Sequence, residues 1–372
     1  MPLRLITAGE SHGRGLVATV EGLPAGLAVD EEYLNGQLRR RQAGYGRGGR
    51  MRIEQDRAEI LSGLVDGVTI GAPVSVLVWN RDWRTGEAPL VRPRPGHADL
   101  VGAQKYGFDD VRRALERASA RETAARVAGA TLARRLLEEF GIRVLSHVVE
   151  LGGVHVADLP PDWDEVARRA ETSDLRCADP HAAQAMHRAI DEAKASGDTL
   201  GGVIEIVAVG VPPGLGSYVH WDRRLDGRIA QAVMSVHAIK GVAIGDAFAI
   251  ASGRGSTAHD EIHYDAARGF YRETNRAGGI EGGVSNGMPI VVRAAMKPLS
   301  TLRAPLRSVD IRTREPAAAA VVRSDVTALP AAGVVCEAML AFVLADALCE
   351  KFGADSLDDM RGAYDRYLQR IR

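Results

Sequence analysis

Residues 117–141 read RASARETAARVAGATLARRLLEEFG, and residues 323–353 read RSDVTALPAAGVVCEAMLAFVLADALCEKFG. Both segments open on Arg-x-(Ser/Asp), continue as an alanine-rich apolar helix pattern and close on Glu-x-Phe-Gly. A glycine turn that leads into a strand lies upstream of each helix, GLVDGVTIGAPVSVLV at 63–78 and GVSNGMPIVV at 283–292. This pattern predicts an internal repeat, and the alternative is chance similarity between glycine turns and apolar helices.

Both alanine-rich patterns are apolar on too many faces for surface helices. Two such halves would pack in the order sheet, helix, helix, sheet, with the helices buried. Further strands are predicted at 3–7, 15–21, 51–54, 59–64, 68–79 and 202–209, and helices from the Asp30 cap to Gly44 and at 110–140, 162–171, 179–195 and 222–237. No Ser- or Gly-rich linker separates these elements, so we expect one domain over residues 1–372.

Composition narrows the class of protein. Hydrophobic residues make up 46% and charged residues 26% of the 372 positions, which is typical of a globular protein. The net charge of −1 gives no bulk attraction to nucleic acid or to an anionic membrane. We find neither a signal peptide nor an uninterrupted apolar run of ~18 residues, so we expect a cytoplasmic protein without a membrane span. Cys177, Cys336 and Cys349 lack metal-ligand spacing, and no metal site is expected.

Two glycine-rich segments near the N-terminus carry polar groups. GESHG at 9–13 places a hydroxyl and an imidazole side by side between glycines, as a catalyst or as a turn-capping group. RRRQAGYGRGGR at 39–50 lets several guanidinium groups converge on one anion. The alternatives for this second segment are a solvated basic face and an RNA-binding Arg/Gly tract.

Further polar groups occur in two later regions. In RPGHAD at 94–99, proline and glycine rigidify the approach to a single histidine, which suits either a proton donor or acceptor or a structural loop. Near the end, the candidates are Gly282, the segment KPLST at 297–301, and RSD at 323–325, whose groups suit an anion, an ion pair or a proton relay.

Three familiar sites are disfavoured. HDEIH at 259–263 has two histidines four apart, but it shows no helical apolar face. It also has an aspartate, Asp260, where a zinc protease has its glutamate. The glycines in GVPPGLG at 210–216 follow a strand, yet the two prolines prevent the turn into a helix that a dinucleotide site requires. Gly-Lys-(Ser/Thr), the end of a phosphate-binding P-loop, is absent from the sequence.

Taken together, the segments resemble the chorismate synthase family over nearly the whole chain. The motifs that carry the resemblance, in family order, are GESHGRG at 9–15, RRRQAGYGRGGRMRIE at 39–54, RPGHADL at 94–100, RASARET at 117–123, GGVSNGM at 282–288, KPLST at 297–301 and RSD at 323–325. The resemblance implies an α+β fold in which two antiparallel four-stranded sheets enclose a helical layer with a pseudo-twofold repeat. It also implies a homotetramer.

The reaction implied by the resemblance is the anti-1,4-elimination of phosphate from 5-enolpyruvylshikimate 3-phosphate, which needs reduced FMN without net redox change. Carried over by position, Arg41, Arg47 and Arg50 would grip the substrate, which carries one phosphate and two carboxylates. His12 would protonate the departing phosphate, and His97 would keep the reduced flavin monoprotonated. Asp325, with Ser11, would help flavin N5 to accept the proton that leaves C6. The implied FMN contacts are Arg117, Ala118, Ser119, His237, Ala238, Gly282, Lys297, Pro298, Leu299, Ser300, Thr301 and Arg323.

Departures from the family pattern bear on partners. His237 stands where a small amide side chain is more usual, which leaves a side-chain contact there open. The insertions of relatives that reduce their own flavin are missing, which predicts an external flavin reductase, with NADPH only an indirect reductant. Two other classes remain as alternatives, a non-catalytic anion- or RNA-binding protein built on the Arg/Gly segment and a plain flavin oxidoreductase.

Overall fold

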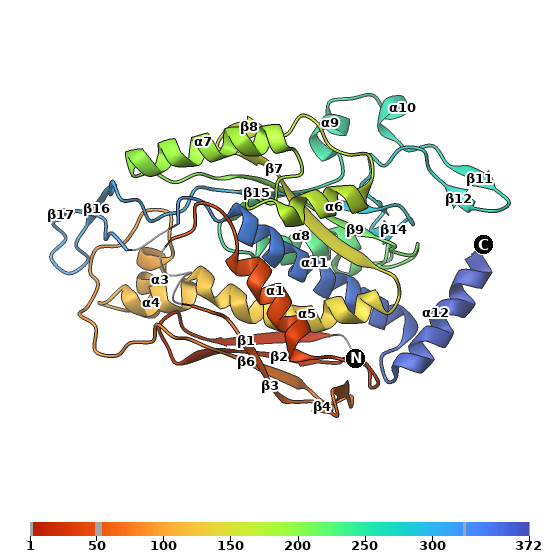
Figure 1. The fold of residues 1–372 in the computed structure, drawn as a ribbon, viewed down its shortest axis with the longest axis horizontal. Coiled ribbons are helices and arrows are strands. Elements are labelled where there is room, and N and C mark those ends of the chain that lie inside the picture. The colour runs from red at the N-terminus through yellow and green to blue at the C-terminus, as the bar shows by residue number, and fades with distance from the viewer. Residues whose placement is uncertain (1–2, 49–53, 323–324, 372) are drawn as a thin grey trace.

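A computed structural model describes residues 3–48, 54–322 and 325–371 (Figure 1). Its first sheet has four antiparallel strands in the order β1-β2-β6-β3. These strands are β1 (Arg4–Gly9), β2 (Gly15–Glu21), β6 (Val74–Trp79) and β3 (Ala58–Ser62). Alternate residues of β2 and β6 are buried, so one face of the sheet is covered and the other faces outward.

The second sheet has five antiparallel strands in the order β10-β15-β9-β7-β8. They are β10 (Ile239–Ile244), β15 (Ile290–Met296), β9 (Gly202–Val209), β7 (Arg143–Leu151) and β8 (Val154–His155). The expectation of four strands is therefore wrong for this sheet, because the two-residue β8 folds back on the end of β7 and adds an edge strand.

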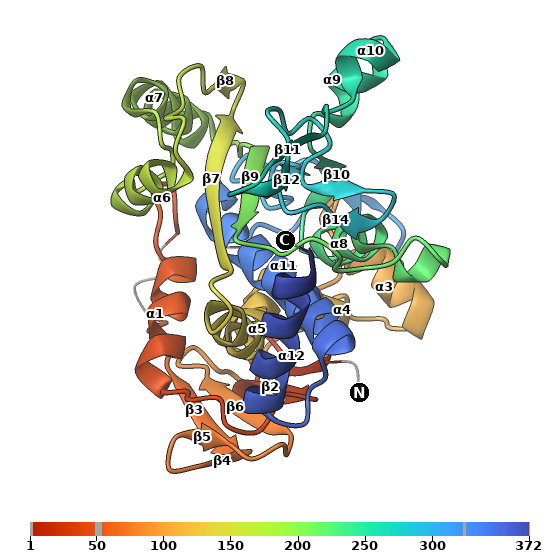
Figure 2. The ribbon, with the colours of Figure 1, turned by 90° about the vertical axis from the view of Figure 1, so that its right-hand side faces the viewer.

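Three helices lie between the two sheets in both ribbon views (Figures 1 and 2). They are α1 (Glu31–Gln42), α5 (Thr123–Glu138) and α11 (Leu329–Phe352). Helix α5 packs on β1, β2 and β6, α11 packs on β7 and β9, and the two helices pack against each other. Their alanines permit this close approach, and one main hydrophobic core runs through both sheets and all three helices. The α+β class is confirmed.

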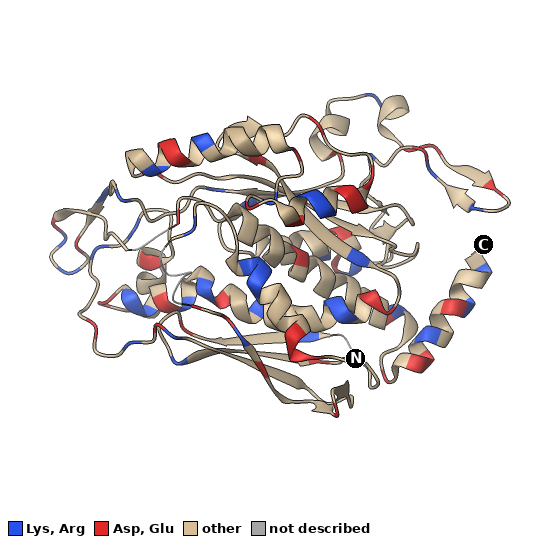
Figure 3. Cartoon of the chain, viewed as in Figure 1, with Lys and Arg blue, Asp and Glu red and all other residues tan. Residues whose placement is uncertain are grey.

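The remaining elements surround this core. Among the described residues, the other helices are α3 (Asp99–Tyr106), α4 (Arg112–Ala118), η1 (Ala120–Glu122), α6 (Trp163–Thr172), α7 (Pro180–Ser196), η2 (Trp221–Arg223), α8 (Leu225–Met234), α9 (Ala247–Ala251), α10 (Gly255–Ala258) and α12 (Leu357–Ile371). Four short hairpins pair β4 (Leu64–Val65) with β5 (Val68–Thr69), β11 (His263–Asp265) with β12 (Gly269–Tyr271), β13 (Ile280–Glu281) with β14 (Val284–Ser285), and β16 (Arg307–Val309) with β17 (Pro316–Ala318). Acidic and basic segments are interspersed along α7 and α12 (Figure 3).

The single helix predicted at 110–140 is wrong. The chain leaves the helical conformation at Ser119, where φ is −69° and ψ is 140°, and α4 ends there. The Ser119 hydroxyl accepts a hydrogen bond from the Arg121 amide, which starts η1 and then α5. A serine with extended backbone is a favourable N-cap, so the apolar pattern alone could not reveal the break. Helix α3 was not predicted.

The strand predicted at 68–79 is also interrupted. Gly71, at φ +78°, and Pro73 separate β5 from β6, because proline has no N–H for a ladder hydrogen bond. Of the strand predicted at 51–54, residues 51–53 lie outside the described part of the chain and Glu54 is in no strand.

Helix α11 is, in the described part of the chain, the one helix long and apolar enough to cross a membrane. However, 83% of its most apolar window is buried inside the protein, so it is a core helix here.

A buried carboxylate in the middle of α11 links the helical layer to the second sheet. The Glu337 side chain is only 1% exposed, and its oxygens accept hydrogen bonds from Arg40 of α1 and Arg134 of α5, each at 2.8 Å. Arg176 donates at 2.9 Å and the Ser146 hydroxyl of β7 at 2.7 Å. Burial alone would raise the pKa of Glu337, but attraction to the three arginines holds it well below the ordinary value.

We expect Glu337→Gln to lower the free energy of unfolding by about 3–5 kcal/mol, because it leaves buried arginines without their counter-charge. The matched control is Glu171→Gln, which contacts Arg40 and Arg176 from a side chain that is 43% exposed and should cost less than about 1 kcal/mol. Denaturant unfolding at neutral pH measures both losses. Equal losses would contradict a special role for Glu337.

The same ion cluster predicts how stability depends on pH. The folded pKa of Glu337 lies below the ordinary 4.5, so its stabilisation is present above about pH 4.5 and is lost as the pH falls further. The wild-type protein should therefore lose its advantage over Glu337→Gln in acid. Unfolding titrations of both proteins between pH 7 and pH 3 measure this.

Candidate functional site

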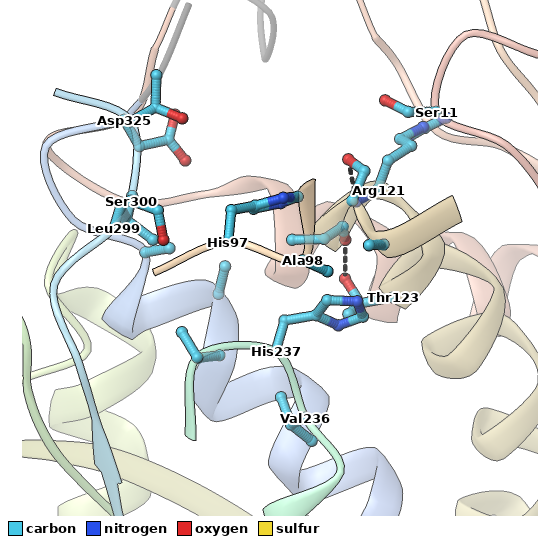
Figure 4. Close-up of a pocket in the computed structure, with 18 of the residues that line it drawn as sticks. Ser11, His97, Ala98, Arg121, Thr123, Val236, His237, Leu299, Ser300 and Asp325 are labelled. Atoms are coloured by element: carbon cyan, nitrogen blue, oxygen red, sulfur yellow. Dashed lines mark hydrogen bonds between the residues drawn. The ribbon is translucent and has the colours of Figure 1, made fainter. Parts of the chain in front are cut away.

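A cavity of about 480 Å³ opens where α5 and α11 begin. Most of the residues predicted for the site line it, from segments far apart in the sequence. They are Ser11, His12, Arg41, Arg47, His97, Ala118, Ser119, His237, Ala238, Lys297, Leu299, Ser300, Thr301 and Asp325. Figure 4 shows Asp325, Ser11 and His237 approaching from different segments with His97 between them.

Part of the wall is apolar. The start of α11 contributes Ala328, Ala331, Ala332 and Val335, and further apolar side chains include Leu115, Val236, Met296, Leu299 and Val322. Charged side chains surround it, with Arg41, Arg47, Arg94, Arg121 and Lys297 on the positive side. A site of this kind accepts a flat apolar group that carries negative charges at its edge.

The turn that carries Ser11 and His12 is fixed by hydrogen bonds from Asn80. Its side-chain amide donates to the carbonyl oxygens of Glu10 (3.0 Å) and Gly13 (2.8 Å). Gly9 begins the turn at φ +106°, where a Cβ would lie 2.4 Å from the Gly15 carbonyl oxygen, so a side chain is excluded there. Asn80 was missed in the sequence analysis because its partners, Gly13 and Glu10, lie 67 and 70 residues earlier in the chain and no local pattern connects them.

His12 is paired with Glu116 of α4. Its Nδ1 lies 2.9 Å from Oε1 of Glu116, and its backbone N–H donates to Oε2 at 2.7 Å. Burial would raise the pKa of Glu116, but the hydrogen bonds from His12 outweigh it and lower the pKa below the ordinary value. The carboxylate therefore accepts from Nδ1–H, which leaves Nε2 as the atom available for proton transfer.

His97 is also paired with a carboxylate, that of Asp99 at the start of α3. The two atoms Nδ1 and Oδ1 are 2.5 Å apart. Asp99 is fully buried and also accepts from the Arg94 guanidinium, which in turn donates to the Thr301 hydroxyl at 2.7 Å. The motif RPGHAD contains this acid, but no pattern in the sequence singled it out.

Asp325 is held by the Arg/Gly segment. Its Oδ2 lies 3.1 Å from Nη1 of Arg47, and its Oδ1 accepts from the Gly48 amide at 2.5 Å. The sequence suggested Arg323, two residues earlier, as the ion-pair partner, and that residue lies outside the described part of the chain. The structure shows Arg47 in this role, so the predicted substrate-binding arginine and the predicted relay acid contact each other.

Arg41 is more constrained than the sequence indicated. It is only 4% exposed, and it donates to Asp56, to the Thr123 hydroxyl and to the Ala120 carbonyl. Burial lowers its pKa to about 10, although Asp56 acts in the opposite direction. Arg121, which was not predicted, shares Asp56 at 2.6 Å and lines the same cavity.

Lys297 and Ala238 belong to adjoining segments. The Lys297 amide donates to the Ala238 carbonyl at 3.0 Å, and Ala238 adopts a left-handed φ of +67° that is uncommon for a residue with a side chain. Nζ of Lys297 donates to the Ser300 hydroxyl at 2.9 Å and the Pro298 carbonyl at 3.1 Å. Burial and the nearby Lys240 lower the pKa of Lys297.

Some predicted site residues lie elsewhere. Arg117 donates to the carbonyls of Thr7 and Gly9 at the end of β1 rather than lining the cavity. Gly282 is at the tip of the β13–β14 hairpin, and Pro298 contributes its backbone carbonyl to Lys297 without lining the cavity. Arg50 and Arg323 lie outside the described residues.

His237 carries an unsatisfied polar atom in the cavity wall. Its Nδ1 is buried and has no hydrogen-bond partner among the described residues. Burial lowers the pKa of the ring from 6.5 to about 4, so the imidazole is neutral near pH 7. A buried polar atom without a partner is costly, which indicates that a ligand atom completes this part of the site.

The described residues hold no cluster of three or more His, Cys, Asp or Glu side chains that could bind a metal ion. Around the cavity they place an apolar surface, several cations and groups able to carry protons, among them His12, His97 and Asp325. Such a site can bind an anionic ring and move protons on it.

Comparisons with known proteins agree on one family. The sequence model of chorismate synthases matches residues 3–349. The chorismate synthase of Desulforudis audaxviator is 56% identical over 100% of this chain and 98% of its own length, and that of Aquifex aeolicus is 51% identical over the same shares. The chain belongs to the chorismate synthase family. A crystal structure of chorismate synthase matches with a TM-score of 0.84 at 44% identity, covering 100% of this chain and 98% of that one.

Membership assigns a reaction class. The chain is a lyase of the shikimate pathway that makes chorismate and phosphate from 5-enolpyruvylshikimate 3-phosphate, and the family uses reduced FMN. The residues present fit that cofactor. The apolar wall suits a flat ring, the cations suit a phosphate, and Nδ1 of His237 is a polar atom that needs a partner.

The environment of His237 predicts its titration. We expect the ring to remain neutral on acidification until about pH 4, because the folded protein disfavours its charged form. With a folded pKa below the ordinary 6.5, His237 costs the protein stability as the pH falls below about 6.5, and this loss levels off near pH 4. A ¹⁵N-histidine NMR titration, assigned with a His237→Asn variant, measures the pKa. The same signal in denaturant is the control, and a native pKa near 6.5 would contradict the prediction.

Proposed function

We propose that this cavity is where phosphate leaves 5-enolpyruvylshikimate 3-phosphate, with FMN against its apolar wall. The observation that supports this most strongly is the convergence of His12, His97 and Asp325 on one cavity that Arg47 also lines. These residues come from the connection between β1 and β2, from the loop before α3 and from the segment before α11, which are far apart in the sequence.

FMN would be held by the walls just described. We assign to it Ala118, Ser119, His237, Ala238, Lys297, Leu299, Ser300 and Thr301, all lining the cavity, and retain Arg117, Gly282, Pro298 and Arg323 as expected contacts that the cavity wall does not include. When bound in its reduced form, FMN supplies an electron-rich ring that assists loss of phosphate without net redox change. Its own negative charge and that of the substrate account for the many cations.

Substrate anions would be bound chiefly by Arg47, with Arg50 as a further candidate. Arg47 is 10% exposed on its side chain, and its salt bridge to Asp325 points it into the cavity. Arg41 is already bonded to Asp56 and Thr123, so we assign it the role of shaping the wall and adding positive potential.

Protons would move at two places. His12 would donate a proton from Nε2 to the departing phosphate, because Glu116 occupies Nδ1. Asp325, held by Arg47 and the Gly48 amide, would take up the proton released from the substrate's C6, with the Ser11 hydroxyl assisting. His97 would keep the bound reduced FMN in its monoprotonated state.

We further infer a single-domain enzyme, residues 1–372, with a pseudo-twofold repeat that relates the two sheet-and-helix halves. We also propose a cytoplasmic homotetramer without nucleic-acid or membrane partners. Relatives of nearly equal length cover the chain end to end, which supports an enzyme that has no reductase insertion and receives reduced FMN from an external flavin reductase, with NADPH acting only through that partner.

An anaerobic assay with photoreduced FMN tests the function. Phosphate and chorismate should form together, with no stoichiometric consumption of NADPH. Consumption of NADPH in proportion to product would indicate a flavin oxidoreductase, and the absence of turnover with intact ligand binding would favour a non-catalytic anion-binding protein.

Arg47→Ala should weaken substrate binding by about 1.5–3 kcal/mol, or about 10- to 150-fold, since it removes a hydrogen bond to a charged group. FMN affinity should change much less. The control is Arg39→Ala, whose side chain is 61% exposed and pairs with Glu32 on the outside of α1. Calorimetric titration measures both ligands, and an unchanged substrate affinity in Arg47→Ala would contradict the assignment.

Asp325→Asn should reduce kcat about 10²- to 10⁴-fold with near-normal binding of both ligands, because the amide keeps the size and one acceptor but loses the basicity. His12→Ala should cost a similar factor. The double variant should lose less than the product of the two factors if both groups act in one proton path. Stopped-flow turnover is the measurement, and a wild-type rate in Asp325→Asn would leave Asp325 only as the ion-pair partner of Arg47.

A further inference from the structure

We propose that Asp99 is a positioning residue for His97, which it fixes in the Nδ1–H tautomer so that Nε2 is the nitrogen presented to the cavity. The proposal rests on the proposed function of His97 as a group that exchanges protons in this site. It concerns a residue that does not line the cavity itself and would act only through the imidazole.

The contacts around Asp99 account for both of its oxygens. Oδ2 accepts from the backbone N–H of Arg94 at 3.1 Å and from its Nε at 2.8 Å. Oδ1 accepts from Nη2 of Arg94 at 3.0 Å and lies 2.5 Å from Nδ1 of His97. A side chain with 0% exposure and four such neighbours has a single orientation, so the imidazole it contacts is fixed as well.

The same contacts distinguish the two tautomers. Nη2 of Arg94 lies 3.1 Å from Nδ1, and this contact alone would favour an Nδ1 without hydrogen. In that case, however, two lone pairs would face each other across the 2.5 Å between Nδ1 and the Asp99 oxygen. Hydrogen bonds from His97 and Arg94 overcome the effect of burial and lower the pKa of Asp99, so its carboxylate is an acceptor only. Nδ1 must therefore carry the hydrogen.

The loop that carries Arg94, His97 and Asp99 is also attached to a second segment of the cavity wall. Arg94 donates from Nη1 to the Thr301 hydroxyl, which belongs to the segment that also holds Lys297. Gly96, at φ +78°, brings the loop so close that a Cβ would meet the Ser300 hydroxyl at 3.3 Å. His97 is thus oriented relative to the residues assigned to FMN, and such second partners of a functional histidine commonly contribute 10- to 100-fold.

The kinetic test is Asp99→Asn, whose amide can present an N–H to Nδ1 and so permit the wrong tautomer. We expect kcat to fall about 10- to 100-fold, with KM and FMN affinity within about 2-fold. In a His97→Gln background the same substitution should cost less than about 3-fold, because its target is already gone. Independent losses that multiply in the double variant would overturn the proposal. The matched control is Asp110→Asn, which removes a carboxylate that caps neighbouring backbone amides without contacting His97.

A measurement on the wild-type enzyme does not depend on how well a variant folds. ¹⁵N-histidine spectra are recorded at neutral pH, and the His97 signal is assigned by its loss in His97→Gln. We expect Nδ1 of His97 to be protonated and Nε2 to be unprotonated. The reverse pattern would overturn the proposal. Wild-type turnover in His97→Gln would instead refute the proposed role of His97 and leave the tautomer result standing, so the two failures are distinguishable.

Discussion

The buried carboxylate of Glu337 is the interaction on which the arrangement of the helices depends. One charge on α11 accepts from Arg40 of α1, Arg134 of α5 and Arg176 before α7, and each of these cations is itself largely withdrawn from water. A hydrophobic contact between alanine-rich helices would tolerate sliding by a turn. A buried ion cluster does not, because any other register leaves a charge without a partner.

This constraint reaches the cavity through neighbouring residues. Arg40 is held by Glu337, and the next residue, Arg41, points to the other side of the chain and bonds Asp56 and Thr123. In the last turn of α1, Arg40 therefore fixes the helix to the buried ion cluster, and Arg41 forms part of the cavity wall. The Arg/Gly segment begins in this turn and continues beyond the end of α1 to Arg47, so the position of Arg47 follows from the same anchor.

The cavity lies where the two long internal helices begin. Ser119, Arg121 and Thr123 line it at the start of α5, and Ala328 and Ala331 line it at the start of α11. The positive end of each helix dipole favours anions and adds to the positive potential of the arginines and Lys297. Asp56 pairs with Arg41, while Glu116 and Asp99 orient His12 and His97. The cavity therefore keeps a positive potential, and its polar side chains have fixed orientations.

The sequence by itself determined the secondary structure that depends on local signals. Asp30 caps α1, and Asp179 with Pro180 begins α7, because these interactions join residues two or three positions apart. The family motifs likewise identified most residues of the cavity wall. Only the tertiary structure revealed the break at Ser119, where extended backbone interrupts an unbroken apolar pattern.

Tertiary structure also decided which charges are paired. Asp325 forms an ion pair with Arg47, which lies in a distant segment of the chain. His12 is paired with Glu116, and Arg41 is paired with Asp56. The separations in sequence range from 15 residues between Arg41 and Asp56 to 277 residues between Gly48 and Asp325. The charge state and the available hydrogens of a side chain depend on what lies within a few ångströms of it, and folding alone brings those groups together.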